Sequence, residues 1–541
     1  MIINWLKAPA FFVYLGLVII FIVQSPKNCI MKKILALSGC CIVLLSCSKN
    51  IKDQQAIASA DAQDLKSSQL QLNQYIKDQF QQTGYFNWKD ASDEMVWTAM
   101  QSTDNIIAVG YKPLQEKSIE NRLHTININD AKWSAAKQQV MQLIYNSERK
   151  FNPSIRIENM EVWKEKVLPV IDVKITSIET LKLLRKSGLV RYAEPMGYDP
   201  IKEFDNEAAL ASGGIGGGSG CGGYNGNTSL LAGSDYSVVS PNAKVSWNYT
   251  YHGIQNAWTK STGAGVKVMV IDSGVSPDQA NLGSEFNQGL SSGRTIEKMF
   301  TLPGEISSDD PCGHGTAMSG AVAAPRCADG NACGVAYNCN FVICRATRDV
   351  YLDESSEVKG VSDAYTWAAD NSTVQIISMS LGRVTGSGQI KDAIQYASGK
   401  GKLMFCAGGT SFSWTAFFVG VIFPASLTEV QAITGVKDAP ALNACADCHK
   451  GKQIDYVIVM EKQSTGLHAL STAMTGDVPT TVGGSSVSTA TAAGIAALVW
   501  SKNPTFTRDD VLNKLTTTAS GYPTKSKNYG WGKLNADAAT N

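Results

Sequence analysis

The stretch VKVMVIDSGVSP, residues 266–277, decides the fold, because a continuous apolar run ends there in an Asp-Ser-Gly turn. A strand that is apolar at every position is buried on both faces, as in a parallel sheet. Asp272 follows the run directly, at the carboxyl end of the expected strand, where open α/β sheets place their active groups. An Asp before Ser-Gly is also a common turn residue that caps the next backbone amides. We therefore take Asp272 as a candidate catalytic carboxylate, with turn capping as the alternative.

Further apolar runs of the same kind lie downstream and alternate with helical patterns. The runs cover residues 340–345, 374–379 and 402–407, and the helical patterns cover 358–371 and 388–400. Strands that alternate with helices predict a parallel sheet that is covered on both faces. The sequence thus predicts an α/β fold with a doubly wound, mostly parallel sheet, and a site at the carboxyl ends of its strands.

A second candidate group lies in PCGHGTAMSGAVA, residues 311–323, where His314 stands between Gly313 and Gly315. Small residues follow through Ala324, as in a tightly packed helix. An isolated histidine is more often a packed or helix-capping residue than a general base, and geometry decides between the two. His314 therefore needs partners from elsewhere in the chain.

The third candidate group lies in VGGSSVSTATAAGIAALVW, residues 482–500, a glycine-led turn followed by an alanine-rich helix. Ser486 falls on the first turn of this helix, where backbone N–H groups and the helix dipole can hold a developing oxyanion. A plain N-cap serine is the alternative interpretation. Together the three segments supply a carboxylate, a base and a nucleophile, in the order Asp272, His314, Ser486.

Residues 245–540 resemble the subtilases, which are subtilisin-like, S8-type serine peptidases. VKVMVIDSGV resembles the family's Asp motif, GHGTAMSGAVAA its His motif and GGSSVSTATAAGIAALV its Ser motif. ISMSLG (377–382), FPAS (423–426) and YGWGKLNADAA (529–539) also fall where family members carry comparable segments. Several motifs in one order are more specific than any one of them.

The resemblance implies a serine endopeptidase that acts on protein or peptide substrates. Asp272 would hold the imidazole of His314 in the correct tautomer, and His314 would take the proton from Ser486. Ser486 would attack the scissile carbonyl and form an acyl-enzyme. In this family Gly313 and Gly315 would let the backbone approach the substrate cleft.

Two positions depart from the family's usual residues. Ala490 stands where the Ser motif usually has proline, which removes no reacting group. The segment AGGTS, residues 407–411, places Thr410 where subtilases usually carry the oxyanion asparagine. We take Thr410 and Ser486 as the oxyanion hole, with Ser411 as the alternative to Thr410. A binding protein that keeps the subtilase fold but is catalytically impaired at this hole is the alternative function.

The resemblance also assigns substrate contacts to SLGR (380–383) and CAGG (406–409). The residues assigned are Ser380, Leu381, Gly382, Ala407, Gly408 and Gly409. No cluster of metal ligands stands out in the sequence, so we expect no metal and no cofactor. Calcium sites are common in the family, but none can be assigned here.

The chain before the peptidase-like part has a different character. Residues 48–200 contain no cysteine, and their patterns predict a small α+β domain. The expected strands are 105–113 and 189–195, and the expected helices are 135–147 and 177–187. Residues 67–80 form an amphipathic stretch and residues 167–175 an alternating run. The segment from IAVGYKP to LVRYAEP resembles the inhibitory propeptide of subtilases, which would make this domain an intramolecular inhibitor.

A glycine-rich stretch separates the two parts. Residues 201–245 are expected to form an exposed linker that proteases can reach. We expect self-cleavage between Pro200 and Ser246, with residues 246–541 as the peptidase domain.

Residues 1–47 are expected to be a signal region. MKKILALSGCCIVLLSC runs from Met31 to Cys47 and has the form of a secretory signal, which favours Met31 as the translation start. Its end, residues 44–47, resembles the lipobox of bacterial lipoproteins, in which the cysteine is lipidated. The protein would then be exported and lipid-anchored to the bacterial cell envelope, at the outer membrane or the cell surface. A membrane anchor over residues 8–23 is the alternative.

The segment CADCH, residues 445–449, matches the pattern of covalent c-type haem attachment, with Cys445, Cys448 and His449 as the attachment residues. It falls just before an expected strand of the peptidase-like part, where a haem would need a pocket. We therefore expect a Cys445–Cys448 disulfide or a metal clip there. An electron carrier that uses this haem is a further alternative function.

Other cysteines suggest disulfides as well. The spacings Cys327/Cys333 and Cys339/Cys344 are compatible with bridges in an oxidising compartment. Cys312 lies two residues before His314, and our hypothesis is that a free thiol there makes the enzyme sensitive to mercurials.

Composition excludes some partners. The chain is 44% hydrophobic and 18% charged, as in globular proteins, with a formal net charge of +1. No basic block occurs, so nucleic acid is not an expected partner. The expected partners are protein or peptide substrates, the chain's own propeptide and a membrane through the lipid anchor.

Overall fold

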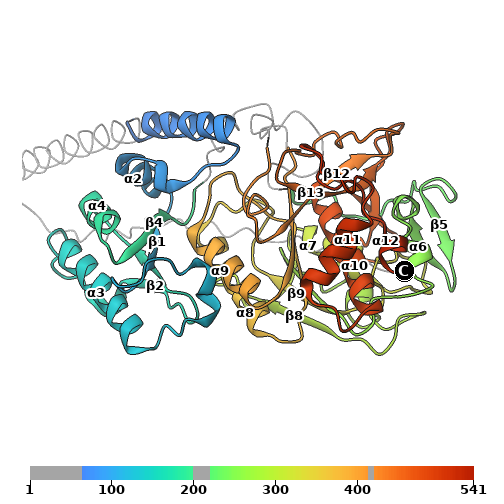
Figure 1. The fold of residues 1–541 in the computed structure, drawn as a ribbon, viewed down its shortest axis with the longest axis horizontal. Coiled ribbons are helices and arrows are strands. Elements are labelled where there is room, and N and C mark those ends of the chain that lie inside the picture. The colour runs from blue at the N-terminus through green and yellow to red at the C-terminus, as the bar shows by residue number, and fades with distance from the viewer. Residues whose placement is uncertain (1–63, 199–219, 412–419) are drawn as a thin grey trace, which may run out of the picture. The chain divides into compact units, whose positions relative to one another are not determined.

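A seven-stranded parallel sheet forms the centre of the chain after residue 220 (Figure 1). The computed structural model describes residues 64–198, 220–411 and 420–541. The strand order is β13-β12-β11-β10-β7-β9-β8, and every neighbouring pair is parallel. The strands are β7 Lys267–Asp272, β8 Ile296–Phe300, β9 Asn340–Arg345, β10 Ile376–Met379, β11 Leu403–Ala407, β12 Gln431–Lys437 and β13 Ile454–Glu461. Every strand expected from an apolar run is therefore present.

Helices cover both faces of this sheet, and the residues of β7 show why. The helices are α6 Ile254–Ala257, α7 His314–Ala323, α8 Ser355–Asp370, α9 Gly388–Gly399, α10 Gly484–Lys502, α11 Arg508–Thr517 and α12 Ala536–Ala539. Val268 and Val270 share a core with residues of α7 and α10. Met269 and Ile271 point the other way and share a core with residues of α8 and α9. The α/β, doubly wound fold class is confirmed.

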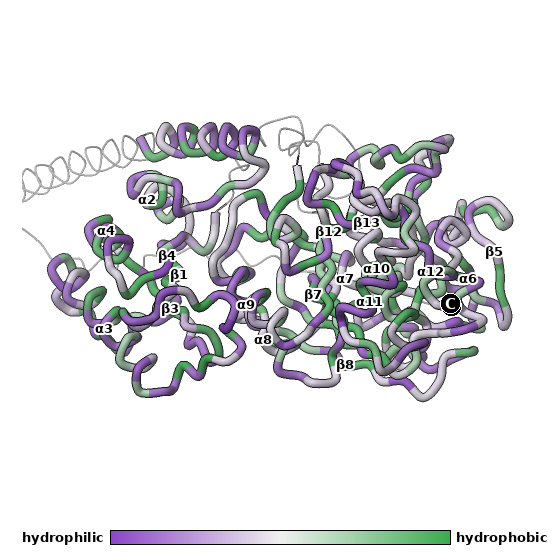
Figure 2. The backbone as a smooth tube through the Cα atoms, viewed as in Figure 1, coloured by the Kyte–Doolittle hydropathy of each residue, from purple (hydrophilic) through white to green (hydrophobic). Residues whose placement is uncertain are grey.

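Helix α10 is the centre of one of these cores. Its residues from Val487 to Trp500 are all buried, and its small side chains let neighbouring elements come close. A Cβ on Gly494 would lie 2.6 Å from Cβ of Val335, so only glycine fits there. In Figure 2 hydrophobic residues mark the strands β7 and β12 inside the fold, while the outer helix over residues 64–83 alternates in hydropathy.

The N-terminal region, residues 64–198, is a small α+β unit of a different kind. Its antiparallel sheet has the order β2-β3-β1-β4. Its elements are a helix over residues 64–83, α2 Asp93–Gln101, β1 Ile106–Tyr111, α3 Ala131–Glu148, β2 Glu161–Trp163, β3 Val170–Lys174, α4 Ile178–Lys186 and β4 Val190–Pro195. The side chain of Ser92 caps α2 and that of Ser177 caps α4. The strands and helices expected for this region are all present.

Smaller elements complete the described chain. They are β5 Tyr236–Val239, β6 Ala243–Ser246, β14 Ala469–Ser471, β15 Thr480–Val482 and the 3-10 helices η1 Trp88–Asp90, η2 Glu120–Thr125, η3 Ile157–Asn159, η4 Trp247–His252 and η5 Ala280–Leu282. The β5–β6 hairpin lies largely within residues 201–245, whose composition predicts an exposed linker. Its alternating pattern is too short to stand out beside so many glycines.

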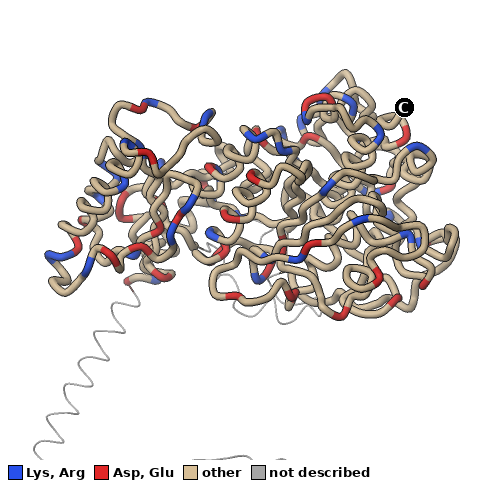
Figure 3. Tube along the Cα trace, turned by 90° about the horizontal axis from the view of Figure 1, so that it is seen from below, with Lys and Arg blue, Asp and Glu red and all other residues tan. Residues whose placement is uncertain are grey.

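Charged residues of both signs are mixed along the chain (Figure 3), in keeping with the net charge of +1. Within the described ranges, we find no helix with the length and apolar character needed to cross a bilayer. The signal, lipobox and anchor expectations for residues 1–47 lie outside the described residues.

Candidate active site

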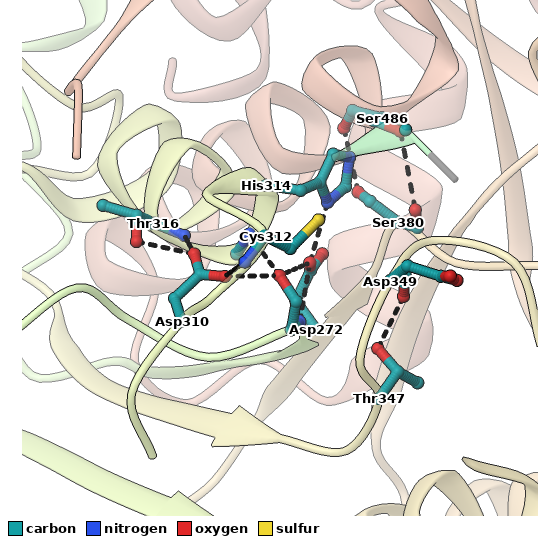
Figure 4. Close-up of polar contacts among 12 residues, drawn as sticks. Asp272, Asp310, Cys312, His314, Thr316, Thr347, Asp349, Ser380 and Ser486 are labelled. Atoms are coloured by element: carbon teal, nitrogen blue, oxygen red, sulfur yellow. Dashed lines mark hydrogen bonds and ion pairs between the residues drawn. The ribbon is translucent and has the colours of Figure 1, made fainter. Parts of the chain in front are cut away.

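Asp272 and His314 meet at the carboxyl edge of the seven-stranded sheet (Figure 4). Asp272 is the last residue of β7, and His314 is the first residue of α7. The Nδ1–H of His314 donates a hydrogen bond of 2.7 Å to Oδ1 of Asp272. Both side chains are buried, with exposed fractions of 4% for His314 and 0% for Asp272. The pair is thus a preformed imidazole–carboxylate couple.

The pKa of His314 is raised above its ordinary value. Burial, the largest effect, opposes protonation, but the nearby carboxylates outweigh it. Asp272 contributes through its charge and its hydrogen bond, and Asp310 and Asp349 add further negative charge. The site therefore stabilises the imidazolium that forms when the ring accepts a proton.

Glycine lets the helix of His314 approach the turn that follows Asp272. A Cβ on Gly315 would lie 2.3 Å from the carbonyl oxygen of Gly274, so no side chain fits. The N–H of Gly315 donates to Oγ of Ser273 at 3.0 Å. Gly315 thus allows α7 to pack against the turn after Asp272. The resemblance predicts a different role for it, approach of the backbone to the substrate cleft.

Asp310 fixes the start of α7 and was not singled out from the sequence. Its carboxylate accepts hydrogen bonds from the backbone N–H groups of Cys312 at 3.0 Å, Gly313 at 2.8 Å and Thr316 at 2.8 Å. Oγ of Ser273 also donates to it, at 2.9 Å. A carboxylate just before a helix is favoured by the helix dipole, which is the signal that could have identified it. Asp310 therefore joins the turn of Asp272 to the helix of His314.

Ser486 lies on the first turn of α10, as expected. Its Oγ donates to the carbonyl oxygen of Ser380 at 3.5 Å, and Oγ of Ser380 donates to the carbonyl oxygen of Ser486 at 2.9 Å. In the view of Figure 4 the ring of His314 lies between Asp272 and Ser486. Among the contacts of the described residues, no hydrogen bond joins Ser486 to the ring. In sites without substrate, such bonds are commonly long and tighten on binding.

Thr410 contacts the residue before Ser486. Its Oγ1 accepts a hydrogen bond of 3.0 Å from the N–H of Ser485 and lies 3.0 Å from Oγ of Ser485. Oγ of Ser485 in turn accepts from the N–H of Gly409 at 3.2 Å. A Cβ on Gly484 would lie 2.6 Å from Oγ1 of Thr410, and the positive φ of 81° at Gly484 also favours glycine. Thr410 is thus packed directly against the turn that carries Ser486.

Ser411 is engaged elsewhere, with His449. Nδ1 of His449 lies 2.8 Å from the carbonyl oxygen of Gly420, which can only accept, so Nδ1 carries the proton. Burial lowers the pKa of His449 and keeps the ring neutral. Nε2 then accepts from Oγ of Ser411 at 2.7 Å. The hydroxyl hydrogen of Ser411 is therefore used by His449.

A small cavity of about 50 Å³ opens beside Ser486. Its lining comprises Val350, Tyr351, Ser380, Leu381, Gly382, Val384, Ala407, Gly409, Thr410, Ile422, His449, Ser485 and Ser486. The assigned substrate residues therefore line it, except Gly408, where a Cβ would meet the side chain of Ile454 and the carbonyl of Ile433. No sequence pattern predicts Tyr351 or Ile422 at the site, and the sequence marks His449 only as part of the haem-attachment motif.

The cysteines correct part of the sequence interpretation. Cys312 is bonded to Cys221, across a separation of 91 residues, so the expectation of a free thiol is wrong. Cys445 and Cys448 form the expected disulfide, which uses both thiols that haem attachment would need. The expected bridges Cys327/Cys333 and Cys339/Cys344 are absent, because these cysteines are buried as free thiols.

The described ranges hold no group of three or more His, Cys, Asp or Glu side chains that could bind a metal ion.

Comparison with known proteins agrees with this geometry. Residues 263–532 match the Subtilase family. M-protease of Shouchella clausii is 30% identical over 282 residues, which cover 52% of this chain and 65% of the relative. This chain therefore spans slightly less than two thirds of the length of M-protease. Subtilisin Savinase of Lederbergia lenta is also 30% identical over 282 residues, covering 52% of this chain and 92% of the relative.

Among solved structures, MycP1 from Mycobacterium smegmatis is 22% identical, with a TM-score of 0.43, and the match covers 57% of this chain and 88% of that one. The identity and coverage with Subtilisin Savinase are sufficient to assign the family. The chain belongs to the subtilase family of serine peptidases.

Proposed function

We propose that this chain is a serine endopeptidase in which Ser486 is the nucleophile, His314 the general base and Asp272 the group that orients the base. The observation that carries the proposal is the 2.7 Å bond between Nδ1 of His314 and Asp272 at the sheet edge that also receives the first turn of α10. The test compares the full chain with its Ser486→Ala variant. The wild type should hydrolyse casein and the variant should not; equal hydrolysis would exclude Ser486 as the nucleophile.

The mechanism follows from the hydrogen bond that the His314 ring already makes. Because Nδ1 of His314 is held by Asp272, Nε2 is the ring atom available as a base. Oγ of Ser486 attacks the scissile carbonyl carbon while its proton passes to Nε2. The ring then gives this proton to the leaving amine, and water hydrolyses the acyl-enzyme by the same steps in reverse. Asp272 keeps the ring in the required tautomer and stabilises its cation.

The raised pKa of His314 sets the expected pH dependence. The base works only when neutral, so kcat/KM should rise with pH as the imidazolium loses its proton. The midpoint of this rise should lie above about pH 6.5, the value for an unperturbed histidine. A pH profile of peptide hydrolysis measures it, and a midpoint below that value would contradict the assignment.

For the oxyanion we propose the hydroxyl of Thr410 together with the backbone N–H of Ser486. Oγ1 of Thr410 accepts from the backbone of Ser485 and can also accept from its hydroxyl, which leaves the hydrogen of Thr410 for the oxyanion. Thr410→Val should lower kcat by about 100-fold or more. Ser411→Ala should have a much smaller effect, because that hydroxyl is bonded to His449. A larger loss of kcat in Ser411→Ala than in Thr410→Val would assign the oxyanion role to Ser411.

The cavity beside Ser486 favours substrates with a small apolar side chain before the cleaved bond. A Cβ on Gly382 would lie 2.4 Å from Cδ1 of Ile422, so the Ile422 side chain already fills space above that backbone. Peptide nitroanilides ending in Ala should be cleaved faster than those ending in Phe or Lys. Ile422→Ala should shift the preference toward larger residues, and an unchanged preference would contradict this pocket assignment.

We further propose that the enzyme is made as a zymogen whose propeptide comprises residues 48–200 and so includes the N-terminal region. In support, strand β4 contacts the peptidase part: Asp392 receives hydrogen bonds from Arg191 and Tyr192. Beyond β4, the carbonyl of Met196 accepts from Arg383, the residue after the cleft segment Ser380–Gly382, at 2.8 Å. This contact with the residue that follows the cleft segment supports a propeptide that blocks substrate.

Self-cleavage should fall before Gly220. Residues after this point are fixed to the peptidase part by the Cys221–Cys312 disulfide and by the β5–β6 hairpin. Intact mass of the purified chain over time should show loss of the N-terminal region in the wild type and none in Ser486→Ala. Cleavage after Cys221 would contradict the proposed position.

We propose, from the sequence alone, that the protein is exported and lipid-anchored through Cys47 to the bacterial cell envelope. Cells labelled with radioactive palmitate should yield labelled protein, and Cys47→Ser should abolish the label. Label that persists in the variant would exclude this anchor.

A binding role without catalysis is the second candidate function. The observation that favours it is the hydrogen bond of the Ser486 hydroxyl to the carbonyl of Ser380, which uses the hydrogen that the base would have to accept. Such a protein would bind peptides, stay intact during incubation and leave casein uncut.

A further inference from the structure

The segment of residues 220–227, here called the strap, runs beside His314. The Cys221–Cys312 disulfide joins it to the loop before α7, and the N–H of Gly222 donates to the carbonyl of Cys312 at 2.9 Å. Its other end is held by residues 474–479, through bonds from the N–H of Met474 to the carbonyl of Tyr224 (2.9 Å) and from the N–H of Asn227 to the carbonyl of Pro479 (2.7 Å). The strap is thus bonded both to the loop before α7 and to residues 474–479.

Tyr224 of the strap lies against the imidazole. The ring centroids of Tyr224 and His314 are 6.0 Å apart, with an angle of 78° between the planes, which is an edge-on contact. Oη of Tyr224 donates to the carbonyl of Gly220 at 2.9 Å, so the ring is fixed at its far end as well. A Cβ on Gly313 would lie 2.7 Å from Cδ2 of Tyr224, which means that the aromatic ring occupies the space a side chain at 313 would take. Gly313 therefore makes room for Tyr224.

The geometry leaves the orientation of His314 dependent on packing. Asp272 fixes one ring nitrogen, but a single hydrogen bond leaves the ring free to tilt about it. Tyr224 packs edge-on against the ring, and His314 is only 4% exposed.

We propose that Tyr224 is a positioning residue for His314 and that the Cys221–Cys312 disulfide holds it in place. Tyr224 acts through the imidazole: it limits the tilt of the ring and excludes water from the His314–Asp272 pair. The effect on the rate rests on the proposed peptidase function, whereas the effect on the ring does not.

The kinetic test uses Tyr224→Ala and the conservative Tyr224→Phe. The alanine variant should lose about tenfold in kcat with KM nearly unchanged, while Phe, which keeps the ring, should stay within about twofold. Loss of the ring admits water and relieves the burial that opposes protonation of His314, so the midpoint of the acid limb should move to higher pH. The acidic groups that act on His314 are Asp272, Asp310 and Asp349, and both variants keep all of them.

A second readout does not need turnover. The full chain with Ser486→Ala, labelled with ¹⁵N-histidine, is titrated by NMR with and without Tyr224→Ala. The His314 resonance should titrate at higher pH in the alanine variant. An unchanged titration together with unchanged kcat would overturn the inference. If the titration shifts but the wild type cuts no peptide, the inference stands and the proposed function fails.

The disulfide is tested by a double-mutant cycle. Cys221→Ser/Cys312→Ser should lower kcat in the same direction as Tyr224→Ala, and adding Tyr224→Ala to it should cost little more. Thermal unfolding of each variant separates a loss of fold from a loss of position. Fully additive effects in folded variants would exclude the disulfide as the support of Tyr224.

Discussion

The N-terminal region and the seven-stranded part of this molecule rely on different contacts. Within the seven-stranded part, glycines let backbones approach closely, as Gly315 does at the Asp272 turn. Between the regions, buried ion pairs accompany a shared apolar core: Arg191 pairs with Asp392, and Lys359 pairs with Glu165 at 3.1 Å. Charged groups regain water when they separate, whereas closely packed apolar surfaces do not. Under the zymogen proposed above, the seven-stranded part is the permanent unit and the N-terminal region, with its buried ion pairs to that part, is the separable one.

The largest expected effect concerns the permanent part. Asp272→Asn should lower kcat by about 10⁴-fold, because an asparagine leaves His314 without the carboxylate that fixes its tautomer. Self-cleavage should stop as well, so intact mass and casein hydrolysis measure the change together. Asp278→Asn is the matched control, since Asp278 is exposed and six positions further on. Equal activity in the two variants would remove Asp272 from the mechanism.

The next effect concerns the separable part and its response to pH. Burial raises the pKa of Asp172 to about 7, and the facing groups are Lys359, Glu165, Gln389 and Asp363. The folded state therefore keeps a proton that the unfolded chain releases near pH 4, so this group makes the region less stable as pH rises from about 4 to 7. Asp172→Asn should remove that loss.

Urea unfolding in the Ser486→Ala background measures the difference. At pH 8 the Asp172→Asn variant should be more stable by up to the order of 4 kcal/mol, and near pH 4 the two proteins should be alike. Glu179→Gln, at an exposed carboxylate of the same region, is the control. Parallel pH profiles of wild type and Asp172→Asn would show that the charge of Asp172 does not weaken this region.

The smallest effect returns to the close packing of the permanent part. A Cβ on Gly320 of α7 would lie 1.7 Å from Oγ1 of Thr472, so Gly320→Ala should cost about 1–3 kcal/mol in the free energy of unfolding. Gly451→Ala, where the nearest atom is the flexible end of Gln453 at 3.2 Å, should cost less. Thermal unfolding compares them, and equal losses would mean that close approach at α7 does not matter.

The strands of the parallel sheet could be predicted because their apolar runs are continuous. Val268 through Ile271 face two cores at once, and only a strand buried on both faces needs that pattern. Asp272, His314 and Ser486 could be nominated because each stands at an element end with a chemical signature beside it. Asp272 and His314 could be expected to lie close together because Asp272 ends a strand and His314 begins a helix.

The support around the site could not be predicted in the same way. The disulfide between Cys221 and Cys312 spans 91 residues, and connectivity at such distance is not readable from spacing. Tyr224 stands in a glycine-rich stretch whose composition indicates a linker, and nothing in its neighbours points to His314. The positions of Ile422 and His449 at the cavity depend on tertiary contacts, which no local sequence pattern predicts.

The distribution of thiols offers a built-in reporter of unfolding. Cys327, Cys333, Cys339, Cys344 and Cys406 are buried and free, and burial raises the pKa of each. Thiol reagents react with exposed thiolate, so the folded peptidase part should be inert to them. Residues 48–200 contain no cysteine. In a chain whose cysteines before residue 48 are changed to serine, pulse alkylation would therefore detect unfolding of the seven-stranded part alone. Unfolding of the N-terminal region would expose no thiol and would cause no alkylation.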